Sequence, residues 1–184
     1  HLVANGVHPG SRVAIAMRNY SEWVVAYWAS VCVGAAAVGM NAWWTPSEME
    51  YALNDSQPGV LIVDDERLER LSQIANTPKM HVISVRTDRA LPAGGARWTD
   101  VMATADPGVL PNIEFDQDDD ATIFYTSGTT GDPKGVVTHH RGAYLNAVSN
   151  AVTSTHKILS RNPDNPVASL SSTTITGQCH RYSE

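Results

Sequence analysis

Short apolar runs alternate with helical patterns along the first half of the chain. The apolar runs are short enough to be buried strands and occupy residues 12–17, 35–40, 59–63 and 81–85. The helical patterns occupy residues 21–28, 45–54 and 65–74. Alternation at this spacing predicts βαβ units, and therefore an α/β fold with largely parallel sheet layers covered by helices.

The expected helices differ in how clearly they begin. Ser21 is expected to be the N-cap of the first helix. The second opens with Thr45-Pro46-Ser47-Glu48, in which the threonine can cap, the proline suits the first helical position and the glutamate completes a capping box. The third helix is short, and its many charges are expected to lie at the surface.

The pattern changes after residue 89. Prolines and glycines mark residues 89–111 as a connecting region, in which one helical turn is expected at residues 98–102. A β-rich run follows at residues 121–126. A loop of Ser, Thr and Gly comes next, then another short apolar run and a helical pattern from His140.

Residues 23–40 carry no charge and approach the length of a membrane span. Ala, Gly and Ser dominate the stretch, and Leu, Ile and Phe are absent, so insertion into a bilayer would be weakly driven. A helix that ends near Gly34, followed by a short buried strand, fits the stretch better. Since the N-terminal sequence also lacks a signal-peptide pattern, we expect a cytoplasmic protein without a membrane span.

Composition narrows the class of protein. The chain is 42% hydrophobic, which argues against wholesale disorder, and 13 Lys and Arg against 19 Asp and Glu give a net charge of −6. This mild acidity argues against a nucleic-acid partner. The two cysteines, Cys32 and Cys179, exclude a disulfide-stapled miniprotein and a cysteine-based zinc module, and favour a reducing compartment.

The loop after residue 125 carries the clearest chemical signal. Its glycines let backbone N–H groups approach a ligand closely, its hydroxyls add donors, and its lysine adds a mobile positive charge. We expect these groups to bind a polyphosphate at the carboxyl end of a strand, where ligands of open α/β sheets bind. The candidate residues are Thr126, Ser127, Gly128, Thr129, Thr130, Gly131 and Lys134. The alternative is a flexible surface loop with a solvated lysine.

The loop differs from three common motifs. A P-loop needs Ser or Thr directly after Gly-Lys, whereas Lys134 lies between Pro133 and Gly135. The chain contains no G-x-G-x-x-G dinucleotide fingerprint. A nucleophile elbow is also excluded, because Tyr125 stands where that motif needs a glycine before Ser127.

From Tyr125 the chain reads YTSGTTGDPKGV, which resembles the phosphate-loop motif of the adenylate-forming (AMP-binding) superfamily at nearly every position. His140-Arg141 follow where that family commonly has His-Arg, and the chain from Leu2 to Ala151 is similar to its N-terminal layout. The resemblance leans towards acyl-CoA synthetases of fatty acids. It implies an incomplete N-terminal lobe of such an enzyme.

The resemblance implies an acid–thiol ligase. Family members activate a carboxylic acid with ATP to an acyl-adenylate, which a thiol, usually coenzyme A, then cleaves. ATP, a fatty-acid-like carboxylate and coenzyme A are therefore the expected partners. The loop would cradle the β- and γ-phosphates and Mg²⁺ would bridge them, although no protein ligand for the metal is assigned.

The resemblance decays after about residue 154. Residues 1–154 are expected to form a partial AMP-binding N-terminal domain, and residues 155–184 a divergent or truncated continuation. The family's C-terminal domain, with its catalytic lysine, is absent, so no catalytic residue is assigned and the fragment is expected to be inactive alone. Two alternatives stay open: a stand-alone nucleotide- or phosphate-binding module, and a non-catalytic remnant.

Other candidate residues have plainer interpretations. Asp116, Asp118, Asp119 and Asp120 are expected to be a solvated approach to a strand rather than a cation site, because the spacing of a calcium loop is missing. Structural roles are expected for five further positions, with Cys32 as an inert core thiol, Trp43 and Trp44 as core or interface side chains, and His139 and His140 as structural or capping residues rather than a metal pair.

Overall fold

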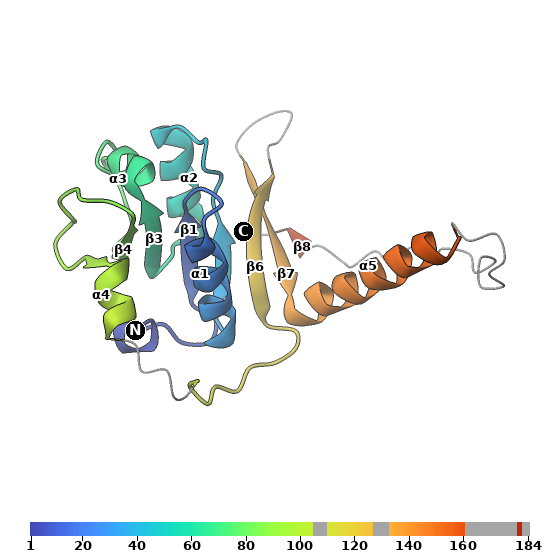
Figure 1. The fold of residues 1–184 in the computed structure, drawn as a ribbon. Helices are drawn as coiled ribbons and strands as arrows, with labels where there is room; N and C mark the ends of the chain where they lie inside the picture. The colour runs from blue at the N-terminus through green and yellow to red at the C-terminus, as the bar shows by residue number, and fades with distance from the viewer. Residues whose placement is uncertain (105–109, 127–132, 161–179, 182–184) are drawn as a thin grey trace.

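A computed structural model describes residues 1–104, 110–126, 133–160 and 180–181. Within these residues the chain forms one sheet in the order β5-β4-β3-β1-β2-β6-β7-β8 (Figure 1). The strands are β1 (Arg12–Ala16), β2 (Ala36–Gly39), β3 (Val60–Asp64), β4 (His81–Val85), β5 (Ala96–Arg97), β6 (Asp120–Thr126), β7 (Lys134–His139) and β8 (His180–Arg181). The helices are η1 (Val3–Asn5), α1 (Ser21–Cys32), α2 (Pro46–Ser56), α3 (Asp65–Leu71), α4 (Trp98–Ala103) and α5 (His140–Ser160).

The sheet is parallel from β5 to β6. Val13 of β1 pairs with Ala37 of β2 on one side and with Val60 of β3 on the other. β6 joins β2 in parallel, with Ala37 opposite Thr122, and the two last strands, β7 and β8, are antiparallel to their neighbours. The predicted α/β class with a largely parallel sheet is confirmed.

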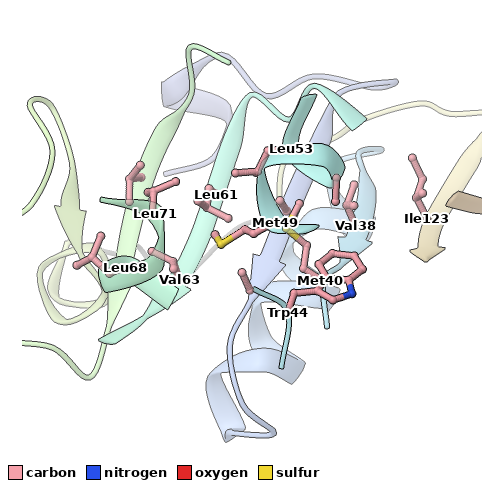
Figure 2. Packing of buried hydrophobic residues seen from close by; sticks show 14 of the residues in the cluster. Val38, Met40, Trp44, Met49, Leu53, Leu61, Val63, Leu68, Leu71 and Ile123 are labelled. Atoms are coloured by element: carbon pink, nitrogen blue, oxygen red, sulfur yellow. The ribbon is translucent and has the colours of Figure 1, made fainter. Parts of the chain in front are cut away.

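Helices cover both faces of the parallel part, because successive side chains of a strand point to opposite faces. On one face, side chains such as Ala14, Val38 and Leu61 pack under α2 and α3 (Figure 2). On the other face, residues such as Val13 and Ile62 pack under α1 and α4. Strands buried on both sides must be apolar at nearly every position, which explains the continuous apolar runs in the sequence.

Two helix starts can be compared with expectation. Thr45 caps α2: its side chain accepts from the Glu48 amide while the Glu48 carboxylate accepts from the Thr45 amide at 2.8 Å, which completes the predicted capping box. The prediction that Ser21 caps α1 is wrong. Tyr20 has the extended backbone of the N-cap position, whereas Ser21 is the first helical residue and donates its hydroxyl to Glu22.

The second half of the described chain is built around the β6–β7 hairpin. β6 lies beside β2, and a Cβ added to Gly39 would come 2.6 Å from the ring of Phe124, so the small residue makes room for this aromatic side chain. α5 follows β7 and extends away from the sheet (Figure 1). α5 spans the boundary expected at residue 154, which stays a prediction.

Burial corrects two expectations. Arg67 is 1% exposed although its helix α3 was expected to present its charges to solvent. Cys32 is exposed rather than a core thiol, since α1 turns Ala26 and Ser30 towards the sheet and leaves apolar residues such as Val24 and Trp28 exposed as well. Within the described part of the chain, no helix is long and apolar enough to cross a membrane.

Candidate functional site

The predicted phosphate loop leaves the sheet at the carboxyl end of β6. Thr126 is the last residue of β6 and Lys134 the first of β7, and the two are paired across the hairpin. The Thr126 hydroxyl donates to the Lys134 carbonyl at 3.5 Å, and both side chains are exposed. A hydroxyl and an ammonium group therefore stand at one end of the hairpin. The other candidate residues, Ser127, Gly128, Thr129, Thr130 and Gly131, lie outside the described residues.

Tyr125 fastens this end of β6 to α2. Its hydroxyl donates to Asp55 Oδ2 at 2.6 Å and to the Ala52 carbonyl at 3.3 Å. Burial, followed by the hydrogen bond to Asp55, raises the pKa of Tyr125 well above its usual range. The ring also meets Trp44 edge to face, with ring centroids 5.5 Å apart. The residue before Thr126 is thus held by three groups of the neighbouring layer.

Gly135 allows the hairpin to close over Tyr125. The two residues are paired, and Gly135 is buried. A Cβ added to Gly135 would lie 3.2 Å from Ile123 Cγ2 and 3.5 Å from Tyr125 Cε1. Ile123 is 5% exposed and has little room to retreat, so a larger residue would push the strand that begins with Lys134 away from β6.

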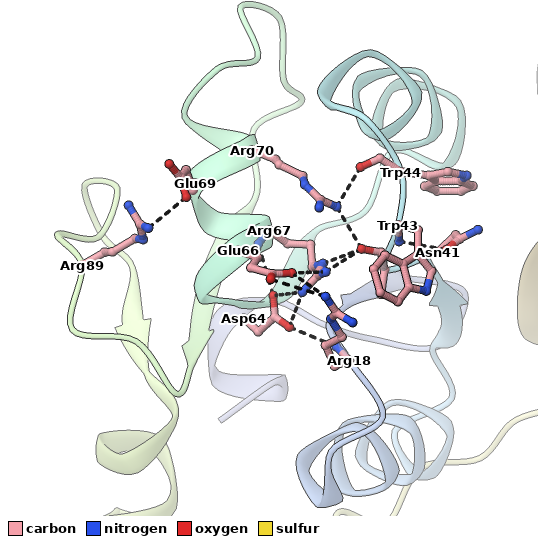
Figure 3. A network of polar contacts seen from close by, with 11 residues as sticks. Arg18, Asn41, Trp43, Trp44, Asp64, Glu66, Arg67, Glu69, Arg70 and Arg89 are labelled. Carbon is pink, nitrogen blue, oxygen red and sulfur yellow. Dashed lines mark hydrogen bonds and ion pairs between the residues drawn. The ribbon is translucent and has the colours of Figure 1, made fainter.

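A buried ion pair lies at the carboxyl ends of β1 and β3 (Figure 3). Arg67 Nη1 donates to both oxygens of Asp64, at 2.9 and 2.7 Å. Asp64 also accepts from the Arg18 amide at 3.0 Å, and Glu66 accepts from Arg18 and Arg67. The ion pair joins the end of β1 to the start of α3, next to the connection between β2 and α2.

That β2–α2 connection, residues 40–45, contains the tryptophan pair. Trp44 is 8% exposed and belongs to the core, as expected (Figure 2). Trp43 differs, since it is 70% exposed and its ring carries the guanidinium of Arg18 at 3.9 Å from the ring centroid. Asn41 closes the turn that leads into the pair, since its side-chain oxygen accepts from the Trp43 amide at 2.9 Å.

The acidic run forms the turn before β6. Asp116 Oδ1 accepts from the Asp118 amide, and Asp119 Oδ2 accepts from the Asp116 amide. Asp118 pairs with Arg141 at the start of α5. Among the residues that the structure describes, no group of three or more His, Cys, Asp or Glu side chains is placed to hold a metal ion. Its own hydrogen bonds and the ion pair to Arg141 make the run the approach to β6 that the sequence predicts.

The histidine pair lies at the junction of β7 and α5. The His139 ring nitrogen is 3.6 Å from the Asp120 carboxylate, and the His140 ring stacks on Phe115 with centroids 4.5 Å apart. Burial lowers the pKa of His140, and the nearby Asp119 opposes this shift. The two rings have different neighbours, which fits the expected structural roles.

The sequence analysis missed the groups that hold the site. At the carboxyl end of β6, Tyr125 is contacted by Asp55 and Trp44, and the β2–α2 connection is contacted by Arg67. All three residues are far from the loop in sequence. Only Arg67 gives a weak signal in the sequence. It lies on the same stripe of its helix as Leu68 and Leu71, and a charged residue in an apolar stripe is unusual.

Comparisons with known proteins show what the chain is similar to. A family model described as AMP-binding enzyme matches residues 1–178. An acetate/butyrate–CoA ligase of Arabidopsis thaliana, described as peroxisomal, is 34% identical over 166 residues, which are 81% of this chain and 29% of the relative. A 4-coumarate–CoA ligase of Oryza sativa subsp. japonica is 32% identical over 146 residues, covering 74% of this chain and 26% of the relative.

Solved structures show the same similarity in three dimensions. The anthranilate CoA ligase AuaEII in complex with anthranoyl-AMP superposes with a TM-score of 0.73 at 32% identity, over 79% of this chain and 28% of that one. The inhibitor-bound N-terminal domain of FACL13 from Mycobacterium tuberculosis gives 0.71 at 30% identity, over 82% and 36%. The chain therefore spans between about a quarter and a third of the length of these proteins.

Proposed function

The chain belongs to the family of AMP-binding enzymes, and from this premise we propose that it is the ATP-phosphate-binding part of an acid–thiol ligase. The observation that carries the proposal is the pairing of Thr126 with Lys134 at the carboxyl end of a parallel strand. The hydroxyl and the ammonium group are exposed at one end of the hairpin. A polyphosphate needs donors and positive charge of this kind.

In the proposed reaction, a carboxylate oxygen attacks the α-phosphorus of ATP and pyrophosphate leaves. The thiol of coenzyme A then attacks the acyl carbonyl of the adenylate, a thioester forms and AMP leaves. Negative charge grows on the departing pyrophosphate in the first step. Lys134, the Thr126 hydroxyl and the loop residues Ser127, Gly128, Thr129, Thr130 and Gly131 would stabilise this charge by donating hydrogen bonds.

The residues near the loop fit a triphosphate better than they fit a bare metal ion. Lys134 and Thr126 are a cation and a donor, whereas the described residues hold no carboxylate cluster for a metal. Mg²⁺ would supply charge neutralisation when bound with the nucleotide, and none of the described residues is assigned as its ligand. Tyr125 would keep the end of β6 in place through Asp55.

The acid that is activated is a finer part of the proposal. The sequence leans towards fatty acids, whereas the relatives carry the names of ligases for acetate or butyrate, 4-coumarate and anthranilate. We propose a carboxylic acid as the substrate class and a fatty acid as its first candidate. A cytoplasmic location is proposed with it, because a chain of 184 residues with two cysteines suits a reducing compartment.

Acid-dependent exchange of pyrophosphate into ATP tests the proposal. The protein that carries this chain at the full length of its relatives is assayed with acetate, butyrate, octanoate, palmitate, benzoate and 4-coumarate. Exchange with at least one acid, strongest with octanoate or palmitate, is the expected result. Exchange with aromatic acids alone contradicts the fatty-acid preference, and no exchange with any acid contradicts the ligase.

A stand-alone nucleotide-binding module is the second candidate. The observation in its favour is that the described chain forms a sheet with apolar clusters on both faces, although it spans little of its relatives' length. Calorimetric titration of the 184-residue chain with ATP separates a binding module from a non-catalytic remnant. ATP binding without any exchange activity in the longer protein would favour the module.

A further inference from the structure

We propose that Arg70, supported by Arg67, is a positioning residue for the phosphate loop. It fixes the β2–α2 connection and, through Trp44 and Tyr125, the end of β6 that carries Thr126. The importance of that end for ATP rests on the proposed function, whereas the positioning itself is a property of the fold. Neither arginine lies in the loop.

Two backbone carbonyls of the connection are held by α3 (Figure 3). The Ala42 carbonyl accepts from Arg67 Nε at 2.8 Å, from Arg67 Nη2 at 2.6 Å and from Arg70 Nη1 at 2.9 Å. Arg70 Nη1 also donates to the Trp44 carbonyl at 2.8 Å. Hydrogen bonds from charged donors are stronger than neutral ones, so the backbone on both sides of Trp43 is tied to one helix.

The guanidinium of Arg67, which binds the Ala42 carbonyl, is itself held in one position. Its side chain is 2% exposed and its guanidinium is paired with both oxygens of Asp64, which in turn accepts from the Arg18 amide. A planar guanidinium held on three sides has one orientation. The position of the Ala42 carbonyl is therefore set by the ends of β1 and β3.

Trp44 transmits the position to β6. Its carbonyl is bound by Arg70, and its buried ring meets the Tyr125 ring edge to face at 76°. Tyr125 directly precedes Thr126, and its hydroxyl is fixed on Asp55. In a close-packed interior, a shift of Trp44 displaces its neighbour Tyr125, so release of the connection loosens the carboxyl end of β6.

The alternative is that these arginines only stabilise the fold. Arg89 offers a matched control, because it binds Asp65 and Glu69 of the same helix and faces away from the connection (Figure 3). Each variant removes one positive charge. Arg70→Met removes it from α3 itself, and Arg89→Met removes it from an ion-pair partner of α3. Only the first variant releases the Trp44 carbonyl, and it also removes one of the three hydrogen bonds from side chains to the Ala42 carbonyl, which keeps the two from Arg67.

Amide hydrogen exchange on the ligand-free chain tests the positioning directly. Arg70→Met is expected to speed exchange at Tyr125 and Thr126 by about ten-fold and to weaken the cross-relaxation between the Trp44 and Tyr125 rings. Ala121, at the other end of β6, is expected to change by less than about two-fold. Arg89→Met is expected to leave all of these signals unchanged, and Arg70→Lys, which keeps a donor, is expected to restore most of the protection.

Titration with ATP tests the consequence for binding. Arg70→Met is expected to weaken ATP binding by about five-fold in the wild-type chain. In a chain that already carries Trp44→Leu, the same substitution is expected to weaken binding by less than about two-fold, because the effects of coupled residues are not additive. Should Arg70→Met fail to fold, Trp44→Leu alone is expected to speed exchange at Tyr125 and Thr126, which keeps the path through Trp44 testable.

The outcomes separate the two proposals. Unchanged exchange at Tyr125 and Thr126 in both Arg70→Met and Trp44→Leu overturns the positioning role, whatever ATP does. Equal acceleration along all of β6 also overturns it, since that is loss of stability alone. Failure of the wild-type chain to bind ATP counts against the polyphosphate site, and faster exchange confined to Tyr125 and Thr126 would still support the positioning role.

Discussion

The hydroxyl of Tyr125 donates a 2.6 Å hydrogen bond to Oδ2 of Asp55. This contact joins the end of β6 to the last turn of α2, far away in sequence. It places a half-buried phenol directly before the residues expected to bind phosphate.

Tyr125→Phe is expected to destabilise the chain by about 1–2 kcal/mol, because the hydrogen bonds to Asp55 and Ala52 are lost. The pKa of Tyr125 is raised in the folded state, so its contribution is complete below the ordinary pKa of about 10 and declines as pH rises above it. The gap in unfolding free energy between wild type and Tyr125→Phe is therefore expected to shrink above pH 10, as measured by urea denaturation.

The matched control is Tyr144→Phe, whose side chain is 68% exposed on α5. It is expected to leave both the stability and its pH dependence unchanged. A gap that stays constant between neutral pH and pH 11 would contradict the raised pKa.

Arg67→Met is expected to be strongly destabilising, by about 3–5 kcal/mol, because it leaves the Asp64 carboxylate buried without its partner. Arg86→Met is the control: Arg86 pairs with Glu22 at 2.8 Å, but its side chain is 53% exposed, and the expected loss is about 0–1 kcal/mol. Urea denaturation of both variants checks the difference. Equal losses would mean that the buried pair contributes no more than a surface pair.

Thr45→Ala is expected to cost about 1 kcal/mol, since it removes the capping hydroxyl of α2. The hydrogen bonds from Thr45, first from its amide and then from its hydroxyl, lower the pKa of Glu48. A lowered pKa stabilises the fold above the ordinary pKa of glutamate, and this contribution is lost as pH falls below it. The difference between wild type and variant should thus narrow in acid, while Thr99→Ala, exposed on α4, should be neutral at every pH.

The sequence predicts the strands better than it predicts which polar groups they bury. Residues 59–63 carry no polar side chain, and residues 81–85 carry only His81 and Ser84, because both faces of the sheet are covered; a pattern of this kind has few other interpretations. The capping box at Thr45 could also be predicted, because its two partners are only three residues apart in the sequence. The two-residue strand β5 could not, because its pairing depends on β4 and not on its own residues.

The errors share a physical cause. α1 has apolar residues on its exposed side and a serine on its buried side, so its sequence does not say that Ala26 faces the sheet and that Cys32 is exposed. The burial of Arg67 depends on two acceptors, the Asp64 carboxylate and the Ala42 carbonyl of the β2–α2 connection, and only the fold brings these together. At the candidate site, the sequence predicts the binding groups, whereas Asp55 and Trp44, which hold them in place, are distant in sequence.

The central claim is that Lys134, at the start of β7, binds the phosphates of ATP. Calorimetric titration of the chain with ATP, in the wild type and in Lys134→Met, tests it most directly, with Lys79→Met, an exposed lysine before β4, as the control. Loss of one charge-assisted contact is expected to weaken binding by about ten-fold or more, while the control binds as the wild type does. Equal affinity of the wild type and Lys134→Met for ATP would contradict the account.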